Sequence, residues 1–279
     1  MPVTYSIKTA AFDSELGAQP DPKDNATTLT VVLRLEVTAI DARTAQDLDG
    51  KIFRAKAWSD GEVRQYLADF KKTVQDCWSN QFFIMFPDPG NPLEAMSAVD
   101  FQRFVHPLQK EKKPYLTCNL LIRFTDKNGH ARVNILNLVP GQGRFHGRIT
   151  RAPGSPDTVT LGSDAVTVFT QQFSPRDEYS QIPAAHEVGH LLGLDHVNAK
   201  HPQCKIDKNA EICYGGTPYE RNDIMGVGWA VTGDHAKTWL KAIALHTGHE
   251  KGWTASHLSP PLEEMMSDDM RRLQPAGVR

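Results

Sequence analysis

Residues 184–196 read AAHEVGHLLGLDH, and the interpretation of the rest of the chain starts from this stretch. On an α-helix, His186 and His190 lie one turn apart along the axis and about 40° apart around it, so both imidazoles can reach one metal ion. Glu187 points to a different side of the same helix, where it can accept a proton without binding the metal itself. The spacing therefore predicts two metal ligands and a neighbouring general base on one helix.

A glycine and a third histidine follow this predicted helix. Gly193 can adopt a left-handed backbone conformation without steric cost, so it can end the helix and turn the chain back. His196 then becomes a third ligand, and three protein ligands leave the fourth position of a tetrahedral zinc ion open. The alternative is a helix whose histidines only pack or face solvent, but the composition of the chain gives the full pattern a chance expectation on the order of 10⁻⁴.

The stretch HEVGHLLGLDH resembles the zinc-binding signature of the metzincin metalloendopeptidases, and it is most similar to the version found in matrixins. Met225, in NDIMGVG, matches the methionine that these families carry in a tight turn beneath the metal. Met225 follows His196 by 29 residues, a longer interval than in matrixins, and the insertion contains two cysteines. Val227 stands where some metzincins have a tyrosine. The resemblance therefore covers roughly residues 184–230 and indicates a divergent metzincin.

The resemblance implies a function and a fold. It implies a zinc-dependent endopeptidase that hydrolyses peptide bonds in polypeptides, with one catalytic zinc ion held by His186, His190 and His196 and with Glu187 as general base. The fold it implies is α+β: a twisted mixed sheet, an active-site helix and a C-terminal helix. In metzincins an edge strand binds the substrate as an added strand, and the segment at residues 165–170 is the expected counterpart.

The pattern along the chain predicts three regions. Leu29, Val31, Leu33, Leu35 and Val37 alternate with more polar residues, as in a strand with one buried face, so residues 1–58 are interpreted as a small N-terminal β module. Residues 59–255 are expected to form the metzincin-like catalytic domain. Residues 256–279 contain Pro260, Pro261 and acidic clusters, and they are interpreted as a polar tail.

Further signals predict elements within the catalytic region. Ser59 and Glu62 form the pattern of a capping box, which predicts that a long helix begins there. The pair Asn128–Gly129 predicts a hairpin between strands at residues 115–125 and 131–139. The remaining expectations are a strand at residues 82–86, a short helix within 93–109, a surface loop at 141–156, one or two strands within 158–171, and a helix capped by Thr232 or Asp234.

Four cysteines and one acidic segment leave alternatives open. Cys204 and Cys213 bracket a polar segment that a disulfide could close, whereas four reduced thiols are the alternative in a cytosolic protein. Asp207, Asn209 and Glu211 alternate as calcium ligands sometimes do, but the segment lacks the glycine and the terminal glutamate of an EF-hand loop. Calcium is therefore only weakly supported.

Composition restricts the classes of partner. The net charge of −2 argues against nucleic-acid binding, and no run of apolar residues is long enough to span a membrane. The N-terminal segment lacks the charged start and the apolar core of a Sec-type signal peptide. We therefore expect synthesis in the cytosol, followed by retention or by export along a non-classical route. The alternative function is a delivered cargo or docking protein that binds a secretion carrier and whose zinc site is structural or degenerate.

Overall fold

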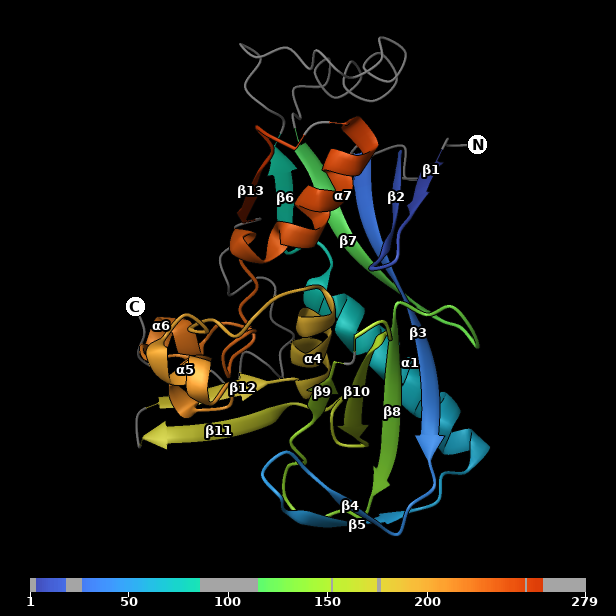
Figure 1. Cartoon of the computed structure of the whole chain (residues 1–279), viewed down its shortest axis with the longest axis vertical. Coiled ribbons are helices and arrows are strands. Elements are labelled where there is room, and N and C mark those ends of the chain that lie inside the picture. Colours follow the sequence, from blue (N-terminus) through green and yellow to red (C-terminus); the bar gives the residue numbers. More distant parts are fainter. Residues whose placement is uncertain are drawn as a thin grey trace, which may run out of the picture.

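Strand β3 (Thr27–Ile40) runs through the middle of the main sheet of this computed structural model (Figure 1). It lies between β7 (Tyr115–Phe124) and β8 (Ala131–Leu138), and both of these strands run parallel to it. The side chains of Leu29, Leu33 and Leu35 are almost completely buried. The alternation of apolar residues in the sequence thus marks a strand that contributes to the core.

The structure describes residues 4–18, 27–85, 115–151, 153–174, 177–248 and 250–257. Within them an eleven-stranded mixed sheet has the order β13-β6-β7-β3-β8-β10-β9, to which the hairpins β1–β2 and β4–β5 are joined through β3 and β8. The remaining strands of this sheet are β1 (Thr4–Lys8), β2 (Asp13–Ala18), β4 (Thr44–Gln46), β5 (Ile52–Lys56), β6 (Phe82–Met85), β9 (Arg148–Thr150), β10 (Asp157–Gly162) and β13 (Thr254–His257). The expected α+β class with a mixed sheet is confirmed at this level.

Residues 1–58, interpreted above as a small N-terminal β module, do not form a sheet separate from the rest of the described chain. Residues 27–40, which belong to that segment, form β3 and pair with strands that come more than seventy positions later in the chain. The buried side chains of β3 also belong to the same hydrophobic core as those of β7 and β8. Alternation predicts that one face of a strand is buried, but it says nothing about which strand lies beside it. Residues 258–279 of the expected tail lie outside the described residues.

The hairpin predicted at Asn128–Gly129 is also wrong, although both of its strands exist. β7 and β8 do not pair with each other, because β3 lies between them. Asn128 does take a positive φ of 58°. The turn residue therefore has the conformation that its type favours, but the connection leads from one side of β3 to the other.

Helices α1 (Asp60–Trp78) and α7 (Lys237–Thr247) pack on the sheet. The predicted capping box of α1 is confirmed, since Ser59 accepts a hydrogen bond from the Glu62 amide and the Glu62 side chain accepts one from the Ser59 amide. The short 3₁₀-helix η3 (Gly233–Ala236) precedes α7 and is capped by Thr232. Trp78 and Trp239 are fully buried, and their rings stack with centroids 6.4 Å apart. These contacts join α1 and α7 in one core.

The substrate strand expected at residues 165–170 is not an edge of the main sheet. Residues 163–166 form turns, and β11 (Phe169–Ser174) pairs only with β12 (Asp177–Gln181) in a separate two-stranded sheet. The last strand in the order of the main sheet is instead β9, which lies within the segment expected to be a surface loop. Because β9 is only three residues long, its periodicity was too short to be recognised. The helix expected within residues 93–109 lies outside the described residues.

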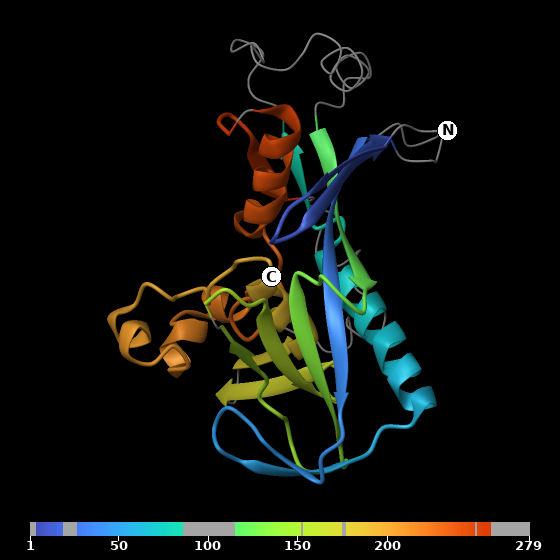
Figure 2. The ribbon, with the colours of Figure 1, turned by 45° about the vertical axis from the view of Figure 1, so that its right-hand side comes forward.

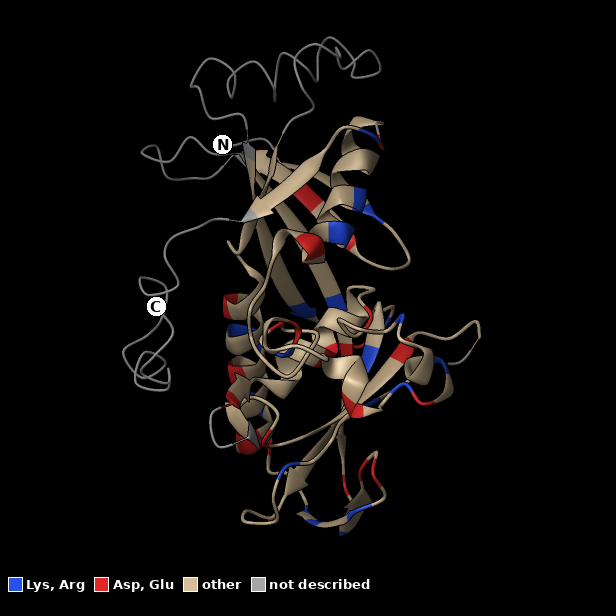
Figure 3. Cartoon of the chain, turned by 90° about the vertical axis from the view of Figure 1, so that its left-hand side faces the viewer, with Lys and Arg blue, Asp and Glu red and all other residues tan. Residues whose placement is uncertain are grey.

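The insertion after His196 stands to the side of the main sheet, as the two views in Figures 1 and 2 agree. It contains α5 (Pro202–Ile206), η2 (Glu211–Tyr214) and α6 (Pro218–Arg221). None of the described helices combines the length and the apolar character needed to span a membrane. Acidic and basic residues are both spread over the chain in Figure 3, in line with the net charge of −2.

Candidate metal centre

Helix α4 (Pro183–Leu191) carries the first two histidines. Pro183 occupies the first turn, where the missing amide hydrogen costs no helical hydrogen bond. The Trp78 indole nitrogen of α1 donates to the Ala185 carbonyl at 3.0 Å, which anchors α4 on the core. The imidazole rings of His186 and His190 lie with centroids 4.9 Å apart. A short buried helix thus presents both rings in one direction.

The chain turns back directly after α4 and brings in the third histidine. Gly193 has a positive φ of 81°, as expected for the residue that ends this helix. His196 Nε2 then lies 3.1 Å from His190 Nε2. One potential ligand atom from each of His186, His190 and His196 lies within 4.8 Å of the other two, so the predicted three-histidine metal group is confirmed.

A backbone carbonyl oxygen lies within hydrogen-bond distance of Nδ1 in each of the three imidazoles. The distances are 2.8 Å from His186 to Ile224, 2.8 Å from His190 to Leu194, and 3.1 Å from His196 to Lys208. A carbonyl oxygen can only accept, so each Nδ1 carries the hydrogen and each neutral ring keeps its lone pair on Nε2. Two such lone pairs 3.1 Å apart repel each other, and a cation between them removes that repulsion. The hydrogen bonding therefore prepares the site for a metal ion.

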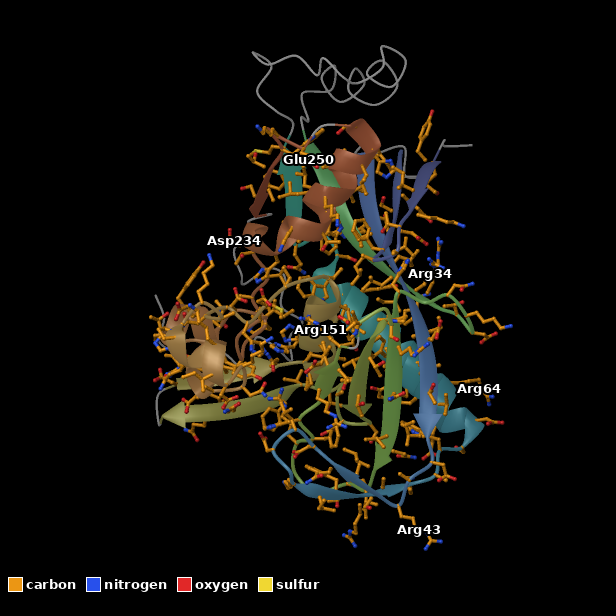
Figure 4. The ribbon with its side chains drawn as sticks, viewed as in Figure 1. Arg34, Arg43, Arg64, Arg151, Asp234 and Glu250 are labelled. Atoms are coloured by element: carbon orange, nitrogen blue, oxygen red, sulfur yellow. A yellow bond between two sulfur atoms is a disulfide. The ribbon has the colours of Figure 1, made fainter. Side chains whose placement is uncertain are left out.

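Electrostatics favour the neutral form of these rings. Burial is the main cause that lowers the pKa of each histidine, and it brings the pKa of His196 to about 4, with a further contribution from His190. Arg151, which Figure 4 labels beside α4, also lowers the pKa of His190. Neutral imidazole is the form that binds metals, so protons compete only weakly for this site near neutral pH.

Glu187 lies next to the ligands but does not belong to the three-histidine group. Burial raises the pKa of its carboxyl to about 7, and the charge of Arg144 opposes this rise. A side chain at Gly147 would begin 3.5 Å from Glu187 Oε1 and 2.9 Å from the Thr160 carbonyl. Because residue 147 is a glycine, the space beside the carboxylate stays open just before strand β9.

Met225 lies against α4. Its side chain is 1% exposed, and a side chain at Gly189 would begin only 2.3 Å from the Met225 sulfur. Glycine at position 189 therefore lets the thioether approach the helix between the two ligand histidines. Asp223 holds this turn, because its Oδ1 accepts from the Met225 amide at 2.7 Å and lies 3.0 Å from His235 Nε2.

The insertion brings a disulfide and a tyrosine to the third ligand. Cys204 and Cys213 form the disulfide that the sequence left open, whereas Cys77 and Cys118 are free. Tyr214 directly follows the disulfide, and its ring centroid lies 4.1 Å from that of His196. Burial, followed by the charge of Glu187, raises the pKa of the Tyr214 phenol.

Gln181 and Arg144 extend the network away from the metal ligands. The Gln181 side-chain nitrogen lies 3.1 Å from His186 Nδ1 and donates to the Gly226 carbonyl at 2.8 Å, while its oxygen accepts from Arg144 at 2.8 Å. The Arg144 guanidinium also lies over the ring of Phe169, with 4.6 Å to the centroid. Gln181 thus connects a ligand histidine, the turn after Met225 and a cation near Glu187.

Sequence reasoning did not single out Gly189, Gln181, Arg144 or Tyr214. Gln181, Arg144 and Tyr214 come close to the ligands through tertiary contacts, and none of them belongs to a local pattern with a chemical meaning. Gly189 lies within the predicted motif, but its importance comes from the approach of Met225. Asp207 and Glu211, considered for calcium, belong to neither group of potential metal ligands among the described residues. The second such group combines Asp47, Asp49 and His146, of which the last two are exposed.

The chain was compared with protein families, curated proteins and solved structures. No match was found in any of the three comparisons.

Proposed function

We propose that this protein is a zinc-dependent endopeptidase. The observation that carries the proposal is the convergence of the three histidines, each held by a carbonyl at Nδ1, beside a carboxylate that is not part of the ligand group. A tetrahedral zinc ion with Zn–N bonds of 2.0–2.1 Å separates its ligand nitrogens by about 3.3 Å. The 3.1 Å between Nε2 of His190 and Nε2 of His196 is close to that value. Three ligands also leave one coordination position free for catalysis.

The chemistry assigns a role to each neighbouring group. Bound zinc would polarise the scissile carbonyl and acidify a water molecule. Glu187 takes a proton from the attacking water, and it later gives a proton to the leaving amine as the C–N bond breaks. Met225 supports the ligand helix from below as an apolar contact, since its thioether packs against Gly189. The proton that Glu187 takes up is thus returned within one turnover.

Strand β9 is the proposed place for a polypeptide substrate. It ends the order of the main sheet, and it begins one residue after Gly147, whose backbone lies near Glu187. An extended peptide that pairs with β9 would run past the carboxylate, and backbone hydrogen bonds would supply affinity without requiring a particular sequence. The proposed substrate-binding strand is therefore β9 and not the segment at residues 165–170, which the sequence resemblance had indicated.

The test is cleavage of a peptide digest of a whole proteome by the purified protein, with and without a chelator. We expect chelator-sensitive cleavage with a defined residue preference. Glu187→Gln is expected to retain zinc and the fold but to lose about three orders of magnitude in turnover, because the proton acceptor is removed. Glu178→Gln, on β12, is the matched control and should retain activity. Full activity of Glu187→Gln would refute the proposed mechanism.

The alternative of a delivered docking protein with a structural zinc site has weaker support. Structural zinc sites use four protein ligands, whereas the group found among the described residues has three. Stoichiometric zinc without any cleavage of the digest would favour this alternative. Deletion of residues 1–58 is not a usable test of carrier binding, because it would remove β3 from the core.

A further inference from the structure

Tyr214 lies beside the three histidines, and the mechanism above gives it no role. Its ring centroid is 4.1 Å from that of His196, with 38° between the planes, and 5.9 Å from that of His186, with 27° between the planes. The phenol ring therefore covers the side of the ligand group that these two histidines form.

The backbone of Tyr214 is fixed from several directions. The preceding residue, Cys213, is joined to Cys204 by the disulfide, and its carbonyl accepts from the Asn198 amide at 3.0 Å. A side chain at Gly226 would begin 2.6 Å from the Tyr214 carbonyl oxygen, so only glycine allows this close approach. The tyrosine is thus held between the loop after His196 and the turn after Met225.

The hydroxyl of Tyr214 is free to bind a substrate. Within the described part of the chain it makes no hydrogen bond. The ring of Tyr214 lies 5.9 Å from that of His186, and Glu187 directly follows His186 on α4. The phenol is therefore close to the ligand next to which the proposed general base stands. A preorganised donor in such a position stabilises developing negative charge without reorganisation during the reaction.

We propose that the Tyr214 hydroxyl donates a hydrogen bond to the substrate carbonyl oxygen as negative charge develops on it. The proposal rests on the peptidase function and adds a catalytic residue to it. The water oxygen forms the new bond to the carbonyl carbon, the carbonyl π electrons move to its oxygen, and the water proton goes to Glu187. Tyr214 keeps its own proton throughout, so it acts as a hydrogen-bond donor and not as an acid.

The test compares wild type, Tyr214→Phe, and Tyr219→Phe as a control. Tyr219 lies in α6 of the same insertion and is 78% exposed, so its hydroxyl should not matter. The measurements are kcat and KM for a fluorogenic peptide that carries a cleavage sequence from the digest, zinc content, and calorimetric affinity for a phosphinic analogue of that peptide. The phosphinic group resembles the tetrahedral, negatively charged transition state, so its affinity reports the hydrogen bond without turnover.

Tyr214→Phe keeps the ring that packs against His196, so zinc content and KM should stay close to wild type. Its kcat and its affinity for the phosphinic peptide should both fall by about 100-fold. Values within twofold of wild type for both quantities would overturn this role while leaving the peptidase function intact. Loss of zinc from Tyr214→Phe would also overturn it, because the hydroxyl would then have a structural role. If the wild type shows no chelator-sensitive cleavage, both the proposed function and this role fail.

Discussion

The group of three histidines is built from two regions that differ in how they place a side chain. Helix α4 sets His186 and His190 by its own local geometry and is anchored on the core through Trp78. The insertion at residues 197–224 supports His196 through long-range contacts: the Lys208 carbonyl, the disulfide and the ring of Tyr214. Helical spacing brings the first pair together, and the Ile224 carbonyl then holds the His186 ring. The position of the third ligand depends entirely on the fold of a segment without such periodicity.

The largest expected effect comes from removing a helix ligand. His186→Ala should weaken zinc affinity by about three orders of magnitude, because one of three protein ligands is lost. His196→Ala should weaken it by less, if α4 keeps its two ligands in place without the insertion. Competition with a chromophoric chelator measures both constants. Equal losses in the two variants would show that the helix and the insertion form one cooperative unit.

Removal of the disulfide tests the insertion separately. The double variant Cys204→Ser/Cys213→Ser should lose about 10- to 100-fold in zinc affinity, because the loop that carries the Lys208 carbonyl is loosened. Its free energy of unfolding should fall by about 2–3 kcal/mol, as estimated for a loop of this length. Chelator competition and urea unfolding measure the two effects, and Cys77→Ser is the control that leaves the disulfide intact. Unchanged zinc affinity in the double variant would contradict a supporting role of the insertion.

Adding a single methyl group at position 189 tests the contact between α4 and the turn that carries Met225. Gly189→Ala would place its side chain 2.3 Å from the Met225 sulfur and 3.0 Å from the Trp78 ring, so a neighbour has to move. We expect a loss of about 1–3 kcal/mol in the free energy of unfolding, measured by urea denaturation. Gly61→Ala is the matched control, because no atom lies within 4 Å of its new side chain. A stable Gly189→Ala variant would mean that Met225 can be displaced without cost.

The smallest effect is expected outside both regions. Ser59→Ala removes the cap of α1 and should lower the free energy of unfolding by about 1 kcal/mol without changing zinc affinity. Thermal unfolding and chelator competition on the same samples check the two parts of this prediction. A change in zinc affinity would show that the stability of α1 reaches the site through Trp78.

The expectations that the structure confirmed depend on residues close together in sequence. His186 and His190 are four positions apart, Gly193 ends α4 with a positive φ, and Ser59 and Glu62 cap α1 across three positions. The expectations that the structure contradicted concern the pairing of strands with segments distant in sequence. Asn128 takes its turn conformation, but β3 separates the two strands that this turn was expected to pair.

By itself, the sequence determined where α1 begins and where α4 ends. It also determined that three histidines can meet at one metal ion. These features follow from helical geometry and from the backbone preferences of single residues, which act over a few positions. Only the tertiary structure decided that β3 lies between β7 and β8 and that the Tyr214 ring packs against His196. Such contacts depend on which distant surfaces bury each other, and the same local pattern is compatible with several partners.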